Sequence, residues 1–302
     1  MLLNIAAAGQ ILSKGAPMEK KLYRKIEWPD KAKIALSIVF NVEAWSADRT
    51  EVSFVAPFPS NAKTQKDSVV VTDREYAQNV GLWRLLDSLD QYHVKMTALV
   101  SGLFAERYPE IVKEIDERGH EVAGHSYDQG RKLITLDPQE EREDIRMSFS
   151  ALQKATKKKP LGWMSQTARC TERTAGYLAE EGALWHSDYL GDDLPHLLDV
   201  NGKRMVAIPY SLITNDMAIY TRQQKDPQEA LRLAIYEFDA LNQEGEAYPK
   251  MMSYGLHPFI SGRPGRARAF KEFIDYVSRK QNVWFARRID IANWWLKHYS
   301  RG

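Results

Sequence analysis

Short apolar runs alternate with longer segments of helical periodicity along nearly the whole chain. Ala32–Phe40 (AKIALSIVF), Met96–Val100 and Met251–Leu256 are runs of the kind that forms buried strands. Asp137–Thr156 is expected to form a long charged helix with Pro at its first turn, and Asp226–Glu244 another helix. Strand–helix alternation without a linker requires parallel strands joined by helical crossovers. The sequence therefore predicts an α/β fold, a distorted (β/α) barrel of about seven parallel strands.

The limits of this pattern define the predicted domains. Residues 26–302 are predicted to form one domain, and residues 1–25 an N-terminal extension or docking arm. Met1–Leu12 is apolar but lacks the positively charged segment that precedes the core of a secretory signal peptide. Residues 46–72 are rich in Ser, Pro and Asn, which favours a long insertion over one face. Asp73 is then expected to cap the following helix.

Composition and charge narrow the possible partners. Hydrophobic residues make up 44% of the 302 residues, enough for a substantial core, and the formal net charge of +2 gives no reason to expect a nucleic acid partner. The single cysteine, Cys170, excludes an internal disulfide and a cysteine zinc cluster and fits a reducing compartment. No run of about 18 apolar residues is present, so no membrane partner is expected. We therefore expect a cytoplasmic protein without a nucleic acid or membrane partner.

Polar and titratable residues gather where the predicted strands end. In parallel α/β barrels the catalytic groups lie at the carboxyl ends of the strands. The positions at these ends are Asn41, Glu43, Ser101, His125, Gln129, Ser165, Arg169, Asp188, Tyr210, Ser211, Asn215, Asp216 and His257. This clustering predicts an active site at one end of the barrel.

Two histidines and one glutamate carry the most specific chemistry. His125 follows a short strand that ends in Gly124, and His257 ends an apolar strand that Pro258 stops. An imidazole titrates near neutral pH, so either histidine is suited to proton transfer. Glu43 is a candidate general base or metal ligand. The structural alternatives are a buried, hydrogen-bonded histidine at each position and a solvated loop carboxylate for Glu43.

Four segments around these residues resemble the polysaccharide deacetylase superfamily (NodB-type, carbohydrate esterase 4) over roughly residues 30–298. They are Phe40–Trp45 (FNVEAW), Gly119–Ser126 (GHEVAGHS), Ala207–Asp216 (AIPYSLITND) and Leu256–Pro264 (LHPFISGRP). Within the superfamily the chain is most similar to the branch that contains the cofactor-independent allantoinases and the cyclic imide hydrolases. The resemblance implies a NodB-type barrel that hydrolyses a carbon–nitrogen bond.

The chain departs from the sugar deacetylases of this superfamily at the metal site. Those enzymes use an Asp base and an Asp-His-His metal triad. Asn41 stands at the position of the base, Glu43 near the metal-binding Asp, His125 at the first metal histidine and Gln129 at the second. Asn41 cannot take a proton, and glutamine is a poor zinc ligand. The family arginine has no clean counterpart, although Arg169 lies nearby in the sequence.

The resemblance implies hydrolysis of a small amide, ureide or cyclic imide. Glu43 or His125 is expected to accept a proton from the attacking water, and His257 to protonate the leaving nitrogen. Asn41, Gln129 or a backbone N–H is expected to hold the oxyanion. The residues expected to contact the substrate are Trp45, Gln129, Arg169, Asp188 and Tyr210. Either no cofactor or a single divalent metal such as zinc is expected, with Glu43 and His125 as the metal ligands.

Two other functions remain open on the sequence. A metal-dependent deacetylase of an acetylated sugar or peptidoglycan fragment would suit the superfamily as a whole. A barrel that has lost catalysis and binds a ligand would account for the replaced Asp and His. By analogy with the allantoinase-like branch, we also expect a homodimer or homotetramer.

Overall fold

The apolar run at residues 32–40 forms most of the central strand, β1 (Ile34–Val42), which is buried along its whole length. Its side chains alternate between two cores. Ile34, Leu36 and Ile38 belong to the core under the outer helices, whereas Ala35 and Val39 belong to the core on the inner face. Because both faces are covered, the strand is apolar almost throughout rather than alternating in polarity.

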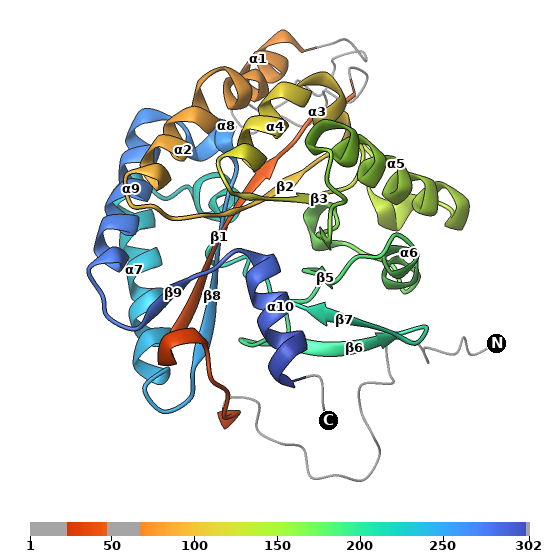
Figure 1. Cartoon of the computed structure of the whole chain (residues 1–302). Coiled ribbons are helices and arrows are strands. Elements are labelled where there is room, and N and C mark those ends of the chain that lie inside the picture. Colours follow the sequence, from red (N-terminus) through yellow and green to blue (C-terminus); the bar gives the residue numbers. More distant parts are fainter. Residues whose placement is uncertain (1–22, 47–66, 300–302) are drawn as a thin grey trace, which may run out of the picture.

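The computed structural model describes residues 23–46 and 67–299 (Figure 1). The strands after β1 are β2 (Thr97–Val100), β3 (Glu121–Gly124), β4 (Gly162–Trp163), β5 (Trp185–His186), β6 (His196–Val200), β7 (Lys203–Ala207), β8 (Lys250–Leu256) and β9 (Val283–Phe285). The α-helices are α1 (Ser68–Tyr76), α2 (Leu82–Asp90), α3 (Gly102–Arg107), α4 (Pro109–Glu117), α5 (Pro138–Thr156), α6 (Thr174–Glu180), α7 (Pro227–Glu244), α8 (Pro258–Ser261), α9 (Pro264–Ser278) and α10 (Arg288–Tyr299). In the described ranges, no helix is long and apolar enough to cross a membrane.

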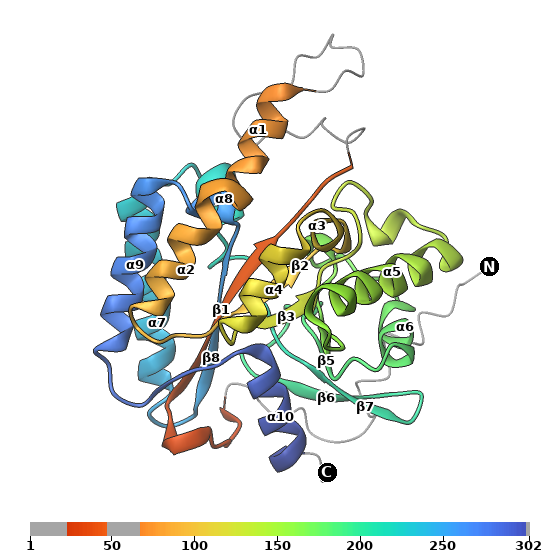
Figure 2. The ribbon, with the colours of Figure 1, turned by 45° about the horizontal axis from the view of Figure 1, so that its top comes forward.

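The strands form one curled sheet in the order β6-β7-β5-β4-β3-β2-β1-β8, and β9 also pairs with β1. All the pairs are parallel except β6–β7. Helices α2, α7 and α9 lie outside β1 and β8, and α5 and α6 lie outside the opposite part of the sheet (Figures 1 and 2). Helix α10 packs its apolar side chains into the inner-face core. The predicted α/β barrel is therefore confirmed, as an incompletely closed one.

The sequence predictions of helix starts succeed at two positions and fail at a third. The helices predicted over residues 137–156 and 226–244 are confirmed as α5 and α7, and the structure shows that Asp137 and Asp226 form capping boxes at their starts. The prediction that Asp73 caps a helix is wrong, because Asp67 accepts hydrogen bonds from the N–H groups of Val69 and Val70 and α1 begins one residue after it. The helix start at Ser68 was missed because the β-branched residues that follow it favour strands over helices.

The predicted insertion and N-terminal extension fall largely outside the described residues, and one hairpin is new. Residues 68–72 belong to α1 rather than to an insertion, and the rest of the predicted insertion lies mostly outside the described residues. Most of the predicted extension, residues 1–22, also lies outside them. The antiparallel hairpin of β6 and β7 was not predicted, because β6 is only half-buried and its sequence carries a weak strand signal.

Candidate active site

The inner face of the sheet brings the predicted catalytic residues together. Asn41 lies in β1 and Glu43 directly follows the strand, and because they are two residues apart, both are expected on the same face as Val39. In β3, Ala123 lies on this inner face, and His125, two residues later, falls on the same face. In β8, Met251 lies on the inner face, and His257, six residues later, falls on that face as well. Since these strands are parallel, their carboxyl ends meet at one edge of the sheet.

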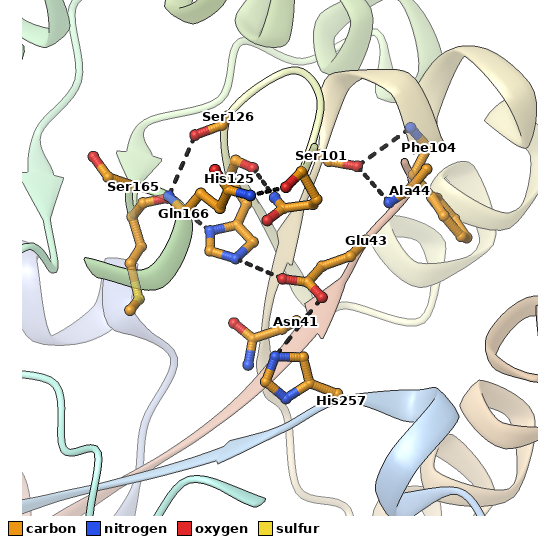
Figure 3. Close-up of polar contacts among 12 residues, drawn as sticks. Asn41, Glu43, Ala44, Ser101, Phe104, His125, Ser126, Ser165, Gln166 and His257 are labelled. Carbon is orange, nitrogen blue, oxygen red and sulfur yellow. Dashed lines mark hydrogen bonds and ion pairs between the residues drawn. The ribbon is translucent and has the colours of Figure 1, made fainter. Parts of the chain in front are cut away.

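At this edge, the Glu43 carboxylate lies between the two imidazoles (Figure 3). Its Oε1 atom is 3.2 Å from Nε2 of His125, and its Oε2 atom is 3.7 Å from Nε2 of His257. All three side chains are at least nine-tenths buried. A carboxylate and two imidazoles in this arrangement can share and pass protons.

Asp216 orients His257 from the side opposite to Glu43. Its Oδ1 atom accepts a 2.6 Å hydrogen bond from Nδ1 of His257, and its Oδ2 atom accepts from the backbone N–H of His257 and from the Ser261 hydroxyl, each at 2.6 Å. The proton on Nδ1 is thereby fixed, and Nε2 faces Glu43. Burial would lower the pKa of His257, but Asp216 and Glu43 outweigh burial and raise it above 6.5.

His125 is held instead by a peptide group. Its Nδ1 atom lies 2.7 Å from the carbonyl oxygen of Met164, and because a carbonyl only accepts, Nδ1 carries the proton. Nε2 of His125 therefore faces Glu43, as Nε2 of His257 does. Both imidazoles thus present the same nitrogen to the same carboxylate.

Glu43 is held in its ionised form by the charges around it. Burial alone would raise the pKa of Glu43, but His257, His125 and Arg74 together lower it below 4.5. Arg74 comes from α1, is 8% exposed, and stacks over the Trp45 ring at 4.1 Å. Burial lowers the pKa of Arg74 to about 10, which leaves it cationic at neutral pH.

A cavity of about 290 Å³ opens beside Glu43. Its lining includes Trp45, Arg74, Gln78, Phe104 and Tyr108. Trp45 packs edge-on against Phe259, the second residue after His257, at 5.9 Å. The predicted substrate contact Trp45 therefore lies in the wall of the cavity that adjoins the carboxylate.

The other predicted site residues lie around this centre but use their polar atoms within the wall. The Asn41 amide donates to the Leu256 carbonyl and to the Tyr210 hydroxyl at 3.3 and 3.4 Å. The Gln129 amide donates to the carbonyl of His125 at 2.5 Å. Asp188 accepts two bonds from Ser165. Their contacts with a substrate stay a prediction.

Tyr210 and Arg169 differ most in their surroundings. Tyr210 is 4% exposed, and its hydroxyl accepts from the Asn215 amide at 2.7 Å as well as from Asn41. Gly255 makes this position possible, because a Cβ there would collide with the Tyr210 hydroxyl. Arg169 is exposed on the turn after β4. The structure thus brings Tyr210 to the wall of the site and leaves Arg169 at the surface.

The donor set does not fit a three-ligand zinc site. Glu43 and His125 are two suitable ligands, but the Gln129 amide nitrogen is directed to a backbone carbonyl. Among residues 23–46 and 67–299, no group of three His, Cys, Asp or Glu side chains is arranged to hold a metal ion. The residues present therefore do not fit the Asp-His-His metal site of the sugar deacetylases.

Three residues of the site were not assigned by sequence reasoning. Asp216 stood among the strand-end residues without a role, since its contact with His257 spans 41 positions. Ser261 carried no signal beyond its place in the HPFIS segment. Arg74 was hidden because its helix was expected to begin at Asp73.

Comparison with known proteins places this chain in a family. The polysaccharide deacetylase family model matches residues 61–183. The crystal structure of PuuE allantoinase is 31% identical, with a TM-score of 0.81, and the match covers 91% of this chain and 94% of that chain. The chain belongs to the polysaccharide deacetylase family.

Other members of the family match over similar lengths. A Pseudomonas aeruginosa PAO1 structure described as a probable polysaccharide deacetylase is 31% identical, with a TM-score of 0.82, over 91% of this chain and 95% of that chain. A Schizosaccharomyces pombe protein named as a polysaccharide deacetylase is 29% identical over 301 residues. The match covers 90% of this chain and 93% of that protein. The enzymes of this family are hydrolases of carbon–nitrogen bonds other than peptide bonds, and the chain belongs to that class.

Proposed function

We propose that this polysaccharide deacetylase family member hydrolyses a carbon–nitrogen bond of a small cyclic or linear amide, ureide or imide. The observation that carries the proposal is the Glu43 carboxylate between two imidazoles that both present Nε2 to it. The likeness to an allantoinase structure along nearly the full chain supports this substrate class over others in the family.

The geometry suggests how the proton moves. Water attacks the substrate carbonyl carbon and loses a proton to Glu43, which is ionised, or to Nε2 of His125 beside it. Protonated His257 then donates its Nε2 proton to the leaving nitrogen, and the carbon–nitrogen bond breaks. The proton held by Glu43 returns to His257 across the 3.7 Å that separates Oε2 from Nε2, which restores the starting state.

The cavity favours a small substrate. Its volume of about 290 Å³ lies near the lower limit of typical ligand pockets, about 300 Å³. Trp45 and Tyr108 contribute aromatic side chains to the lining, and Arg74 and Gln78 contribute N–H groups suited to carbonyl oxygens. A planar five-membered ring with alternating carbonyl and N–H groups matches this lining in size and polarity.

The first experiment measures hydrolysis of a defined panel before and after treatment with a chelator, with metal content measured on the same sample. The panel holds allantoin, succinimide, hydantoin and acetylated chitin oligomers. We expect turnover of a ring substrate that survives chelation. Turnover of the acetylated sugars alone, lost on chelation, would show a metal-dependent deacetylase instead. Absence of turnover on the whole panel, with retained binding of a ring compound, would favour a binding protein.

A further inference from the structure

The peptide group between Met164 and Ser165 connects His125 to a second carboxylate. Its carbonyl oxygen accepts the Nδ1 proton of His125 at 2.7 Å, and its N–H donates to Oδ1 of Asp188 at 2.6 Å. These two groups belong to one planar, conjugated unit. Burial raises the pKa of Asp188 to about 6, so the carboxyl is mainly ionised at pH 7 and above. Its negative charge at the N–H end then polarises the carbonyl and strengthens the bond that the carbonyl accepts from the imidazole.

A second contact fixes the orientation of the Asp188 carboxylate. The Ser165 hydroxyl donates to Oδ2 of Asp188 at 2.6 Å and accepts from the indole N–H of Trp163 at 3.0 Å. The hydroxyl proton is thus directed at Asp188, because the other side of the oxygen is occupied by the indole. Ser165 and Trp163 are fully buried. Both carboxylate oxygens are committed to Ser165, which leaves Asp188 better suited to orient the peptide than to bind a substrate.

The two imidazoles are therefore supported in parallel ways. Asp216 touches Nδ1 of His257 directly at 2.6 Å, whereas Asp188 reaches Nδ1 of His125 across one peptide group. In each case a carboxylate lies behind the imidazole and Glu43 lies in front of it. A carbonyl with strengthened acceptor character keeps the proton on Nδ1, and Nε2 then stays available to Glu43.

We propose that Asp188 is a positioning residue that fixes the tautomer and orientation of His125 through the Met164–Ser165 peptide. Asp216 has the same effect on His257 by direct contact. The consequence for turnover rests on the proposed function, but the effect on the imidazole does not depend on any substrate.

The test uses the full chain with isotope-labelled histidine and follows the Nδ1-bound protons by NMR at one fixed pH. Asp188→Asn keeps an oxygen for the Ser165 N–H and removes the charge. We expect it to move the His125 Nδ1 proton upfield and to speed its exchange with water about tenfold, with the His257 signal unchanged. Asp216→Asn is the matched variant. It should change the signal of the His257 Nδ1 proton and leave the His125 signal unchanged. Ser165→Ala loosens the carboxylate and should give a smaller change at His125 in the same direction.

Glu121→Gln serves as the control, since Glu121 is a buried carboxylate whose partners are Thr97, Trp185 and the backbone of Ile289. It should move neither imidazole signal. The proposal is overturned if folded Asp188→Asn and Ser165→Ala proteins keep the wild-type His125 signal, or if Glu121→Gln moves it equally. With an active substrate, Asp188→Asn should also lower kcat about tenfold. A panel without any turnover would defeat the proposed function and leave the NMR result standing.

Discussion

Two parts of the barrel interior bury charged side chains, and they surround them differently. In the base, made of Thr97, Glu121 and Arg288, the fully buried Arg288 guanidinium donates to the hydroxyls of Ser187 and Ser253 and to the carbonyls of Ile208 and Pro209. Glu121 accepts from one hydroxyl, one indole and one backbone N–H. In the mouth, made of Glu43, His125, Asp216 and His257, titratable groups face one another.

The difference distinguishes buried charges that stabilise the fold from buried charges that take part in proton transfer. The side-chain hydrogen-bond partners of the base are neutral groups that exchange no protons with it, so the base is expected to contribute stability. Arg288 also bonds both to Ser253 in β8 and to the carbonyl of Pro209, which follows β7. It thereby connects two strands, β7 and β8, that are not neighbours in the sheet. In the mouth, the contacts of Glu43 with the two imidazoles and of Asp216 with Nδ1 of His257 each join two groups that compete for a proton, which is the arrangement expected where protons must move.

The same substitution at the two carboxylates tests this contrast most strongly. Glu43→Gln should lower turnover about a thousandfold or more while the protein still folds, because it removes the group that accepts the proton. Glu121→Gln should keep turnover and lose about 1–3 kcal/mol of unfolding free energy, because its new NH₂ group faces a donor. Steady-state kinetics and denaturant titration of both variants provide the measurement. Equal losses of turnover would remove the distinction between mouth and base.

Arg288 offers a second way to break the comparison. Arg288→Met should lose about 3 kcal/mol of unfolding free energy or more, because it leaves buried carbonyl and hydroxyl groups without their donor. Its neighbour Arg287 pairs with Asp290 at a partly exposed site, so Arg287→Met should lose about 1 kcal/mol or less. Urea titration of the two variants gives the difference directly. Similar losses would mean that the buried guanidinium is no more important than a surface ion pair.

Much of the mouth could be predicted from the sequence because its residues lie at strand ends. The parity of β1 places Asn41 and Glu43 on one face, and the runs that end at His125 and His257 fix where those imidazoles emerge. The capping residues Asp137 and Asp226 likewise follow from local chemistry. Each of these features depends on a few neighbouring residues.

The base and the supports of the imidazoles could not be predicted in this way. Arg288 and Ser187 are 101 positions apart, and His257 and Asp216 are 41 positions apart. Arg74 enters the site only because α1 begins after Asp67 rather than at Asp73. These contacts depend on how elements that are distant in the sequence pack together, and local sequence periodicity does not predict that packing.

The pH dependence of turnover should show the electrostatics of the mouth. Glu43 must be ionised, so activity falls as pH drops through its pKa, which lies below 4.5. His257 must be protonated, so activity falls about tenfold per unit as pH rises through its pKa, which lies above 6.5.

Asp216→Asn sharpens this prediction, because Asp216 is one of the charges that raise the pKa of His257. The variant should move the alkaline limit of kcat/KM to lower pH and leave the acidic limit in place. The stability that Asp216 gives protonated His257 should follow the same direction, being present below 6.5 and lost as pH rises through the raised pKa of His257. An alkaline limit that stays where it was in Asp216→Asn would mean that another group protonates the leaving nitrogen.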